Sequence, residues 1–300
     1  MNIVPDLLFE RESLRAQIKR WKWLFFIALI IFIIVMGRSS LSAKHQDLVA
    51  RVRLDGVIEY SPELIDKLKN LGEDSKIKAI ILHINSPGST AFAGEELYVT
   101  LKKISQNKPV VSVLETVAAS GGYMAALGTD YILARNMTIT GSIGVLWQSF
   151  EVVEMANKLG IKFIEIKSSP LKASPNPMEI MTPEVKAVAM ETVDDSYQIF
   201  LKMLMESRKM DKNQAIKLAD GRIYTGMRAK ELNLIDAIGG EDEALAWLEG
   251  EKKIPAKTKV IDVELEKPES ITSELAKFFR NTNSIFGKLL NKSNSGVLAY

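Results

Sequence analysis

Short apolar runs rich in β-branched residues alternate with amphipathic segments from Leu48 onward. This alternation is typical of βαβ units, in which helices cover both faces of a parallel sheet. The pattern therefore predicts an α/β fold with a mostly parallel sheet. The strands that it predicts lie at residues 49–54, 79–84, 110–114, 131–134, 143–146 and 162–166.

Helices are predicted between and after these strands. A long helix begins after Thr182, which can cap it, has Pro183 in its first turn and runs to about residue 207. Residues 251–300 are expected to form a C-terminal extension with a strand at 259–265 and an amphipathic helix at 273–290. That helix either packs on its own domain or faces a membrane or a neighbouring subunit. The other predicted helices lie near residues 62–71, 94–105, 121–127, 151–159, 212–219 and 228–232.

The beginning of the chain predicts a membrane anchor. Residues 1–22 are polar and basic, and an apolar run follows them. With its flanks the run approaches the roughly 17–25 residues that a spanning helix needs, and the basic flank favours a cytoplasmic N-terminus. We expect a transmembrane signal anchor at 23–37, a linker at 38–47 and an exported domain at 48–250. A cleaved signal peptide is the alternative, because residues 40–43 include small side chains, although Arg38 disfavours it.

Composition excludes several classes of protein. Hydrophobic residues make up 47% of the 300, enough for a large core, and a net charge of +2 without basic clusters argues against nucleic acid as a partner. The chain has no cysteine, which excludes thiol nucleophiles and disulfides. Its two histidines, His45 and His83, are too few for a histidine-rich metal site. A Ser-His-Asp triad would have to use one of them, and we expect no metal or cofactor.

The candidate nucleophile is Ser120, which stands between an apolar run and a pair of glycines. The predicted strand 110–114 and helix 121–127 place it at a strand-to-helix turn, where free amides favour negative charge. An ordinary N-cap serine is the alternative. The loop 85–90 also follows a predicted strand, at the end where open α/β sheets bind ligands. Its amides and that of Gly121 could hold an oxyanion, unless the loop is only a connecting turn.

A serine nucleophile needs a proton acceptor, and because histidine is nearly absent the remaining candidates are a lysine or a carboxylate. Lysine is the better candidate of the two. A lysine amine serves as a general base only where burial keeps it neutral. The segment 166–175 carries two candidates, Lys167 and Lys172. Considered alone, each is better explained as a solvated surface lysine.

Three motifs in one order resemble a known family. The loop 85–90 (NSPGST), ASGGY at 119–123 and TGSIGV at 140–145 are similar to those of the signal peptide peptidase A family, short form, in peptidase family S49. The resemblance covers roughly residues 48–248. It implies a Clp-protease/crotonase-like fold and a membrane-anchored serine peptidase with a Ser/Lys dyad.

The resemblance also implies roles for particular residues. Ser120 matches the nucleophile, Lys172 the general base, and Ser142 a serine that hydrogen-bonds the base. Lys167 does not match. The family's oxyanion hole uses the second glycine of a Ser-Pro-Gly-Gly loop, whereas this chain has Gly88 followed by Ser89. The amide of Ser89 can still donate beside that of Gly121, provided that its backbone adopts the conformation the hole requires.

The implied substrates are cleaved signal peptides, with small or apolar residues near the scissile bond. The implied assembly is a ring-shaped homo-oligomer at the outer face of the bacterial cytoplasmic membrane. Two other functions remain open: an inactive membrane-bound scaffold of the same fold, which the Ser89 departure favours, and a crotonase-like acyl-CoA enzyme, which export disfavours.

Overall fold

The computed structural model describes residues 19–33 and 47–264. Residues 19–33 form a helix in a unit separate from the one that begins at Asp47, and large apolar side chains such as Trp23 and Phe25 are exposed on it. Among the described residues, no helix combines the length and apolarity needed to cross a membrane. The predicted N-terminal segment up to residue 18, most of the linker, His45 and the predicted helix 273–290 lie outside the described residues.

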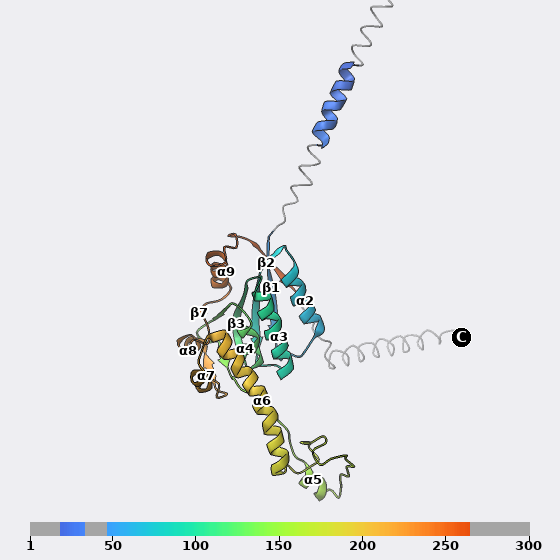
Figure 1. Ribbon diagram of the computed structural model, residues 1–300, viewed down its shortest axis with the longest axis vertical. Coiled ribbons are helices and arrows are strands. Elements are labelled where there is room, and N and C mark those ends of the chain that lie inside the picture. The colour runs from blue at the N-terminus through green and yellow to red at the C-terminus, as the bar shows by residue number, and fades with distance from the viewer. Residues whose placement is uncertain (1–18, 34–46, 265–300) are drawn as a thin grey trace, which may run out of the picture. The chain divides into compact units, whose positions relative to one another are not determined.

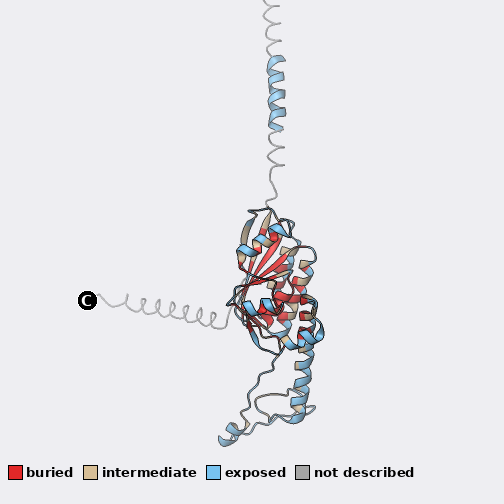
Figure 2. Cartoon of the chain, turned by 90° about the vertical axis from the view of Figure 1, so that its left-hand side faces the viewer, coloured by how far each residue is buried: buried red, intermediate tan, exposed pale blue. Residues whose placement is uncertain are grey.

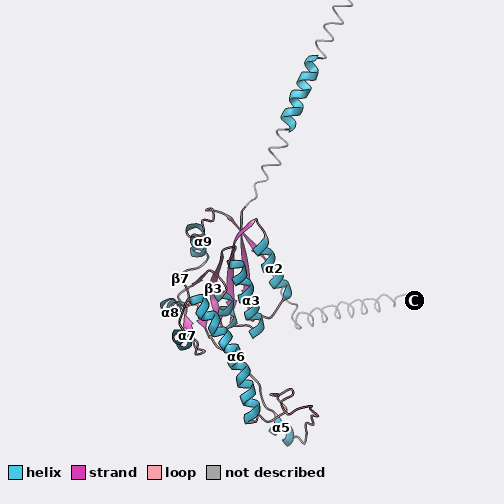
Figure 3. Ribbon diagram, viewed as in Figure 1, coloured by secondary structure: helices cyan, strands magenta, loops and turns pink. Residues whose placement is uncertain are grey.

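The unit that begins at Asp47 is an α/β domain built on one sheet (Figure 3). Its strands are β1 (Leu48–Asp55), β2 (Ile77–Ser86), β3 (Val110–Ala119), β4 (Tyr131–Ala134), β5 (Ile139–Gly141), β6 (Ile223–Thr225), β7 (Ala237–Ile238) and β8 (Lys259–Val263). Its helices are α2 (Pro62–Glu73), α3 (Ala91–Ser105), α4 (Gly121–Leu127), α5 (Val153–Lys158), α6 (Pro183–Arg208), α7 (Lys212–Leu218), α8 (Gly226–Glu231) and α9 (Glu241–Gly250).

The sheet is mostly parallel, as the sequence predicts. Its strands run in the order β6-β5-β3-β2-β1-β8, with β4 paired to β3 and β7, and only the β5–β6 pair is antiparallel. Strand β8 pairs with β1, so the sheet continues past residue 250. Strand β3 pairs with β4 through its first half and with β5 through its second half.

The central strands are apolar throughout because both of their faces are covered. Successive side chains of a strand point to opposite faces. In β2, Ile80, Leu82 and Ile84 contact the larger core, which α2, α3, α4 and α6 also line, whereas Ala79 and Ile81 contact a smaller core against α9. Figure 2 shows the buried residues of the chain in red, gathered at the centre of the domain. Two-sided burial explains why the sequence shows continuous apolar runs here.

Two predicted strands are absent, and both lie beyond the sheet. Residues 143–146 and 162–166 have no strand conformation, and the neighbouring strand is β5, which ends at Gly141. A strand requires a series of backbone hydrogen bonds to a neighbouring strand. Among the described residues, the segment 143–146 has one such bond, from the Gly221 amide to the Ile143 carbonyl at 3.2 Å, and the segment 162–166 pairs with no strand. Residues 145–182, which we call the arm, instead extend with α5 and the outer half of α6 away from the sheet (Figure 1). Many apolar side chains of the arm are exposed, Ile166 by 99%.

Two buried polar contacts hold α4 and α6 in place. The hydroxyl of Tyr123, which is fully buried in α4, donates to the carbonyl oxygen of Leu234 at 2.6 Å. Arg208, at the end of α6, donates two hydrogen bonds to the Asp236 carboxylate at 2.8 and 3.0 Å and one to the carbonyl of Asn233. These contacts attach the loop 233–236, which follows α8, to α4 and to the end of α6.

We expect Arg208→Ala to destabilise the domain, because it leaves the Asp236 carboxylate without its partner. The loss should be about 2–4 kcal/mol in the free energy of unfolding, since breaking a largely buried ion pair is costly. Arg228→Ala is the matched control, because the Arg228–Glu231 pair is exposed and should change stability by less than about 1 kcal/mol. Urea denaturation measures both variants, and equal stabilities would contradict this account.

Candidate active site

Strand pairing brings the three sequence motifs together at one end of the sheet. Near its end, β3 pairs with β2 through Ala118 and Ser86, and with β5 through Ala119 and Gly141. The segments that follow these strands are the loop 86–90, the turn at Ser120 and the segment 142–145. They therefore lie side by side although they are far apart in the sequence.

Ser120 occupies a strained turn between β3 and α4. Its φ of 50° and ψ of −121° are unusual for a residue with a side chain. The backbone is held on both sides, because the Ser120 amide donates to the carbonyl of Gly141 and the Ser120 carbonyl accepts from the amide of Met124, each at 2.8 Å. The hydroxyl makes no capping hydrogen bond to α4. The alternative of an ordinary N-cap serine is therefore not the conformation found.

Glycines let the backbone around Ser120 pack closely. A Cβ atom added to Gly121 would lie 2.6 Å from the amide nitrogen of Ser89, and one added to Gly122 would lie 2.9 Å from the carbonyl oxygen of Ser86. A Cβ added to Gly88 would lie 3.6 Å from the Ser120 hydroxyl oxygen. Side chains at 121 and 122 would thus push the loop 86–89 away from the serine.

The backbone amide of Ser89 points toward Gly121, beside the Ser120 turn. The carbonyl of Gly88 and the amide of Thr90 both bond to Ile58, in a parallel bridge between Ile58 and Ser89. In such a bridge the N–H of the middle residue points to the opposite edge, here toward Gly121. The φ of Ser89 is not positive, so serine needs no glycine-type conformation at this position. Two amides consequently lie close together beside Ser120, as an oxyanion site requires.

A cavity of about 910 Å³ opens beside these groups. Gly88, Ser89, Ser120 and Gly121 line it, and so does Ser142, whose backbone is anchored by a 2.8 Å bond from its amide to the Arg222 carbonyl. Five of the six site residues predicted from the sequence therefore line one cavity.

Lys172, the sixth, does not line this cavity. It lies in an exposed turn of the arm, where its amide donates to the carbonyl of Ser169 at 3.1 Å. A single chain thus presents the candidate nucleophile and oxyanion donors without this lysine.

Lys167 is held by carboxylates within the arm. It forms ion pairs with Glu165 at 2.7 Å and with Glu179. Desolvation alone would lower the pKa of Lys167, but the hydrogen bonds to Glu165 and Glu179 outweigh it and hold the pKa above its ordinary value. The Lys167 contact also lowers the pKa of Glu179 to about 2. A lysine kept charged in this way is a poor general base.

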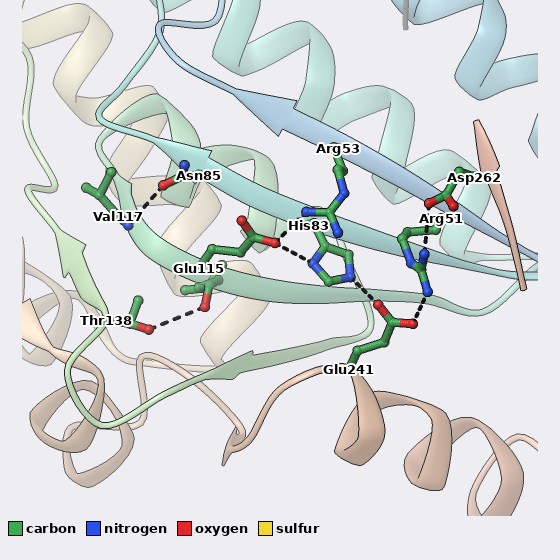
Figure 4. Close-up of polar contacts among 10 residues, drawn as sticks. Arg51, Arg53, His83, Asn85, Glu115, Val117, Thr138, Glu241 and Asp262 are labelled. Atoms are coloured by element: carbon green, nitrogen blue, oxygen red, sulfur yellow. Dashed lines mark hydrogen bonds and ion pairs between the residues drawn. The ribbon is translucent and has the colours of Figure 1, made fainter. Parts of the chain in front are cut away.

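His83 lies on the other face of the sheet and has no part in this site. Leu82 and Ile84 contact the core beneath α4, so the side chain of His83 between them points toward α9. There its Nδ1 lies 2.7 Å from Glu115 and its Nε2 lies 2.9 Å from Glu241 (Figure 4). Since both ring nitrogens have carboxylate partners and the residue is buried, a triad through His83 is excluded.

Other cavity residues were missed in the sequence because they come from separate elements. They include Val57, Glu95 on α3, Met124 on α4 and Ser196 on α6. For Glu95 a signal was present, since it stands six positions after Ser89 on the helix that follows the loop. Met124 and Ser196 carry no such local signal.

A family profile and several relatives identify the family to which this chain belongs. The profile of peptidase family S49 matches residues 102–255. A Methanocaldococcus jannaschii protein named as a candidate protease is 34% identical over 256 residues, covering 76% of this chain and 82% of that protein. The chloroplastic serine protease SPPA of Arabidopsis thaliana is 35% identical, covering 69% and 31%. An Enterococcus faecium protein named as a candidate signal peptide peptidase SppA is 36% identical, covering 65% and 57%.

The contacts of His83 with Glu115 and Glu241 allow a test of whether this residue belongs to the active site. His83→Ala should lower the free energy of unfolding by about 2–4 kcal/mol, because Glu115 and Glu241 lose a buried partner. The reactivity of Ser120 per folded molecule should not change. Thermal unfolding and labelling by a serine-reactive probe measure these effects, with Lys78→Ala on the same strand as control. Loss of Ser120 labelling in folded His83→Ala would contradict the assignment.

Proposed function

Because the chain belongs to peptidase family S49, with relatives named signal peptide peptidase SppA, we propose that it is a serine endopeptidase with a Ser120/Lys172 dyad. Its substrates are cleaved signal peptides and similar apolar peptides. The observation that carries the proposal is the turn at Ser120. Its hydroxyl makes no capping hydrogen bond to α4 and lies beside the amides of Ser89 and Gly121 in an open cavity.

The proposed reaction is an acyl transfer. Neutral Lys172 takes the proton of Ser120, whose oxygen attacks the peptide carbonyl, and the amides of Ser89 and Gly121 hold the oxyanion. The lysine then gives its proton to the leaving amine. The lysine amine then takes a proton from a water molecule, whose oxygen attacks the acyl-enzyme, and the proton passes to the Ser120 oxygen as the ester bond breaks. Ser142, which lines the cavity, would orient the lysine by a hydrogen bond once the lysine is there.

We further propose that Lys172 reaches the cavity from another copy of the chain. Two observations support this: Lys172 is exposed in its own chain, and the arm that carries it also exposes large apolar side chains. Surfaces of that kind are typical of protein interfaces. In a ring of identical subunits the arm of one copy would lie against the cavity of the next. A heterologous contact of this type forms a ring when the rotation between copies closes.

The proposed location is the outer face of the bacterial cytoplasmic membrane, where cleaved signal peptides remain. Support comes from the apolar run at residues 23–36, which follows a basic segment, and from the exposure of its side chains on the helix 19–33. The N-terminus would stay in the cytoplasm.

An inactive scaffold is the second candidate. The observation in its favour is that Lys172 lies outside the cavity of its own chain. A scaffold would bind peptides in the same cavity without cleaving them, and the variants below separate the two functions.

Ser120→Ala and Lys172→Ala should each lower peptide hydrolysis by at least about 1000-fold while the protein remains folded, since each removes one half of the dyad. Lys167→Ala is the matched control, because Lys167 lies in the same arm, and it should retain measurable activity. The assay is cleavage of a quenched fluorescent apolar peptide by the full-length protein in detergent. Substantial activity in either dyad variant would refute the dyad. Complete loss of activity in folded Lys167→Ala would indicate that Lys167 is the general base.

Mixed oligomers test whether the dyad forms between copies. When Ser120→Ala and Lys172→Ala chains are coexpressed with different tags and purified through both tags, some sites combine an intact serine with an intact lysine. For random mixing, about one quarter of the sites should be active, because each dyad draws on two adjacent subunits. A dyad within one chain predicts no recovery, and inactive mixed oligomers would contradict the proposal.

A further inference from the structure

The candidate active-site cavity carries one ionisable side chain, that of Glu95. The other lining residues are small, apolar, hydroxyl-bearing or amide-bearing, and none of them is basic. Glu95 lies in α3 one turn after Ala91, and Ala91 also lines the cavity, so this face of α3 forms part of its wall.

Within residues 19–33 and 47–264, the Glu95 carboxylate has no cationic partner. None of the ion pairs among the described residues involves it. The residue is half-buried, so solvent screens its charge less than that of a fully exposed glutamate. An unpaired carboxylate in a largely apolar cavity attracts a cation and repels an anion.

We propose that Glu95 is a specificity-determining residue that binds a lysine or arginine side chain, or a free amino group, of the peptide substrate. This inference rests on the proposed function and makes its substrate class narrower: apolar peptides with a positive charge close to the scissile bond. Signal peptides combine these features, since a basic segment precedes their apolar core.

Apolar surface beside the cavity fits the remainder of such a peptide. Val57, which lines the cavity, is 66% exposed. Tyr60 and Phe92 are also exposed and stack edge to face, with ring centroids 4.9 Å apart. Together with Glu95 they offer contacts for apolar side chains next to contacts for a cation.

The test is a scan of one charge along a peptide. The host is a quenched apolar peptide, and a single norleucine is replaced by lysine or by glutamate at each position around the cleaved bond. At one position, lysine should raise kcat/KM roughly threefold to tenfold over norleucine and glutamate should lower it, with a preference that shrinks as salt is added.

The variant E95Q should abolish the lysine preference at that position. Its neighbour gives the matched control, because Glu96 lies on the same helix but does not line the cavity, so E96Q should retain the preference. A lysine preference that survives in E95Q, or is absent from the wild-type protein, would overturn the inference. So would an equal loss for lysine and norleucine peptides with a shifted pH profile, because Glu95 would then act on Lys172. If the wild-type protein leaves the host peptide uncut, the proposed function itself fails.

Discussion

The strained turn at Ser120 is the constraint on which the rest of the site depends. A non-glycine residue in this conformation costs about 1–3 kcal/mol, and it persists only where its surroundings fix it. Here the amide of Ser120 is tied to β5 through Gly141, and Gly121 packs against the loop that follows β2. The ends of three paired strands therefore determine where the hydroxyl points. The same packing brings the amide of Ser89 next to that of Gly121. The strained backbone of Ser120 and the arrangement of the two oxyanion donors therefore have one cause.

The candidate serine and amides lie in a buried part of the molecule, and the proposed general base lies in an exposed part. The sheet and its two cores hold the serine and the amides in a buried framework, whereas Lys172 lies in the arm, whose apolar side chains are largely exposed. If Lys172 completes the site of a neighbouring copy, as proposed, activity depends on assembly, because a cavity without its base cannot transfer the proton. On that proposal, an isolated subunit would not hydrolyse peptides.

The features that were predictable from the sequence are local. Strands β1 to β3 follow from apolar runs between turn signals, and the turn at Ser120 follows from a serine before two glycines. The strands predicted at 143–146 and 162–166 were wrong because strand formation requires a partner, which local sequence does not reveal. The hydrogen bond between His83 and Glu241 joins residues 158 positions apart, and the presence of Ser196 in the cavity depends on how α6 packs. Contacts of this kind depend on tertiary structure.

The central claim is that Ser120 is an activated nucleophile in a site completed by Lys172. The most direct measurement is labelling of the full-length protein with a fluorophosphonate probe, followed by mass spectrometry to find the modified residue. The account predicts one adduct, on Ser120, which forms faster as pH rises and is lost in Lys172→Ala. An adduct on another serine, or no adduct in the correctly folded protein, would contradict it.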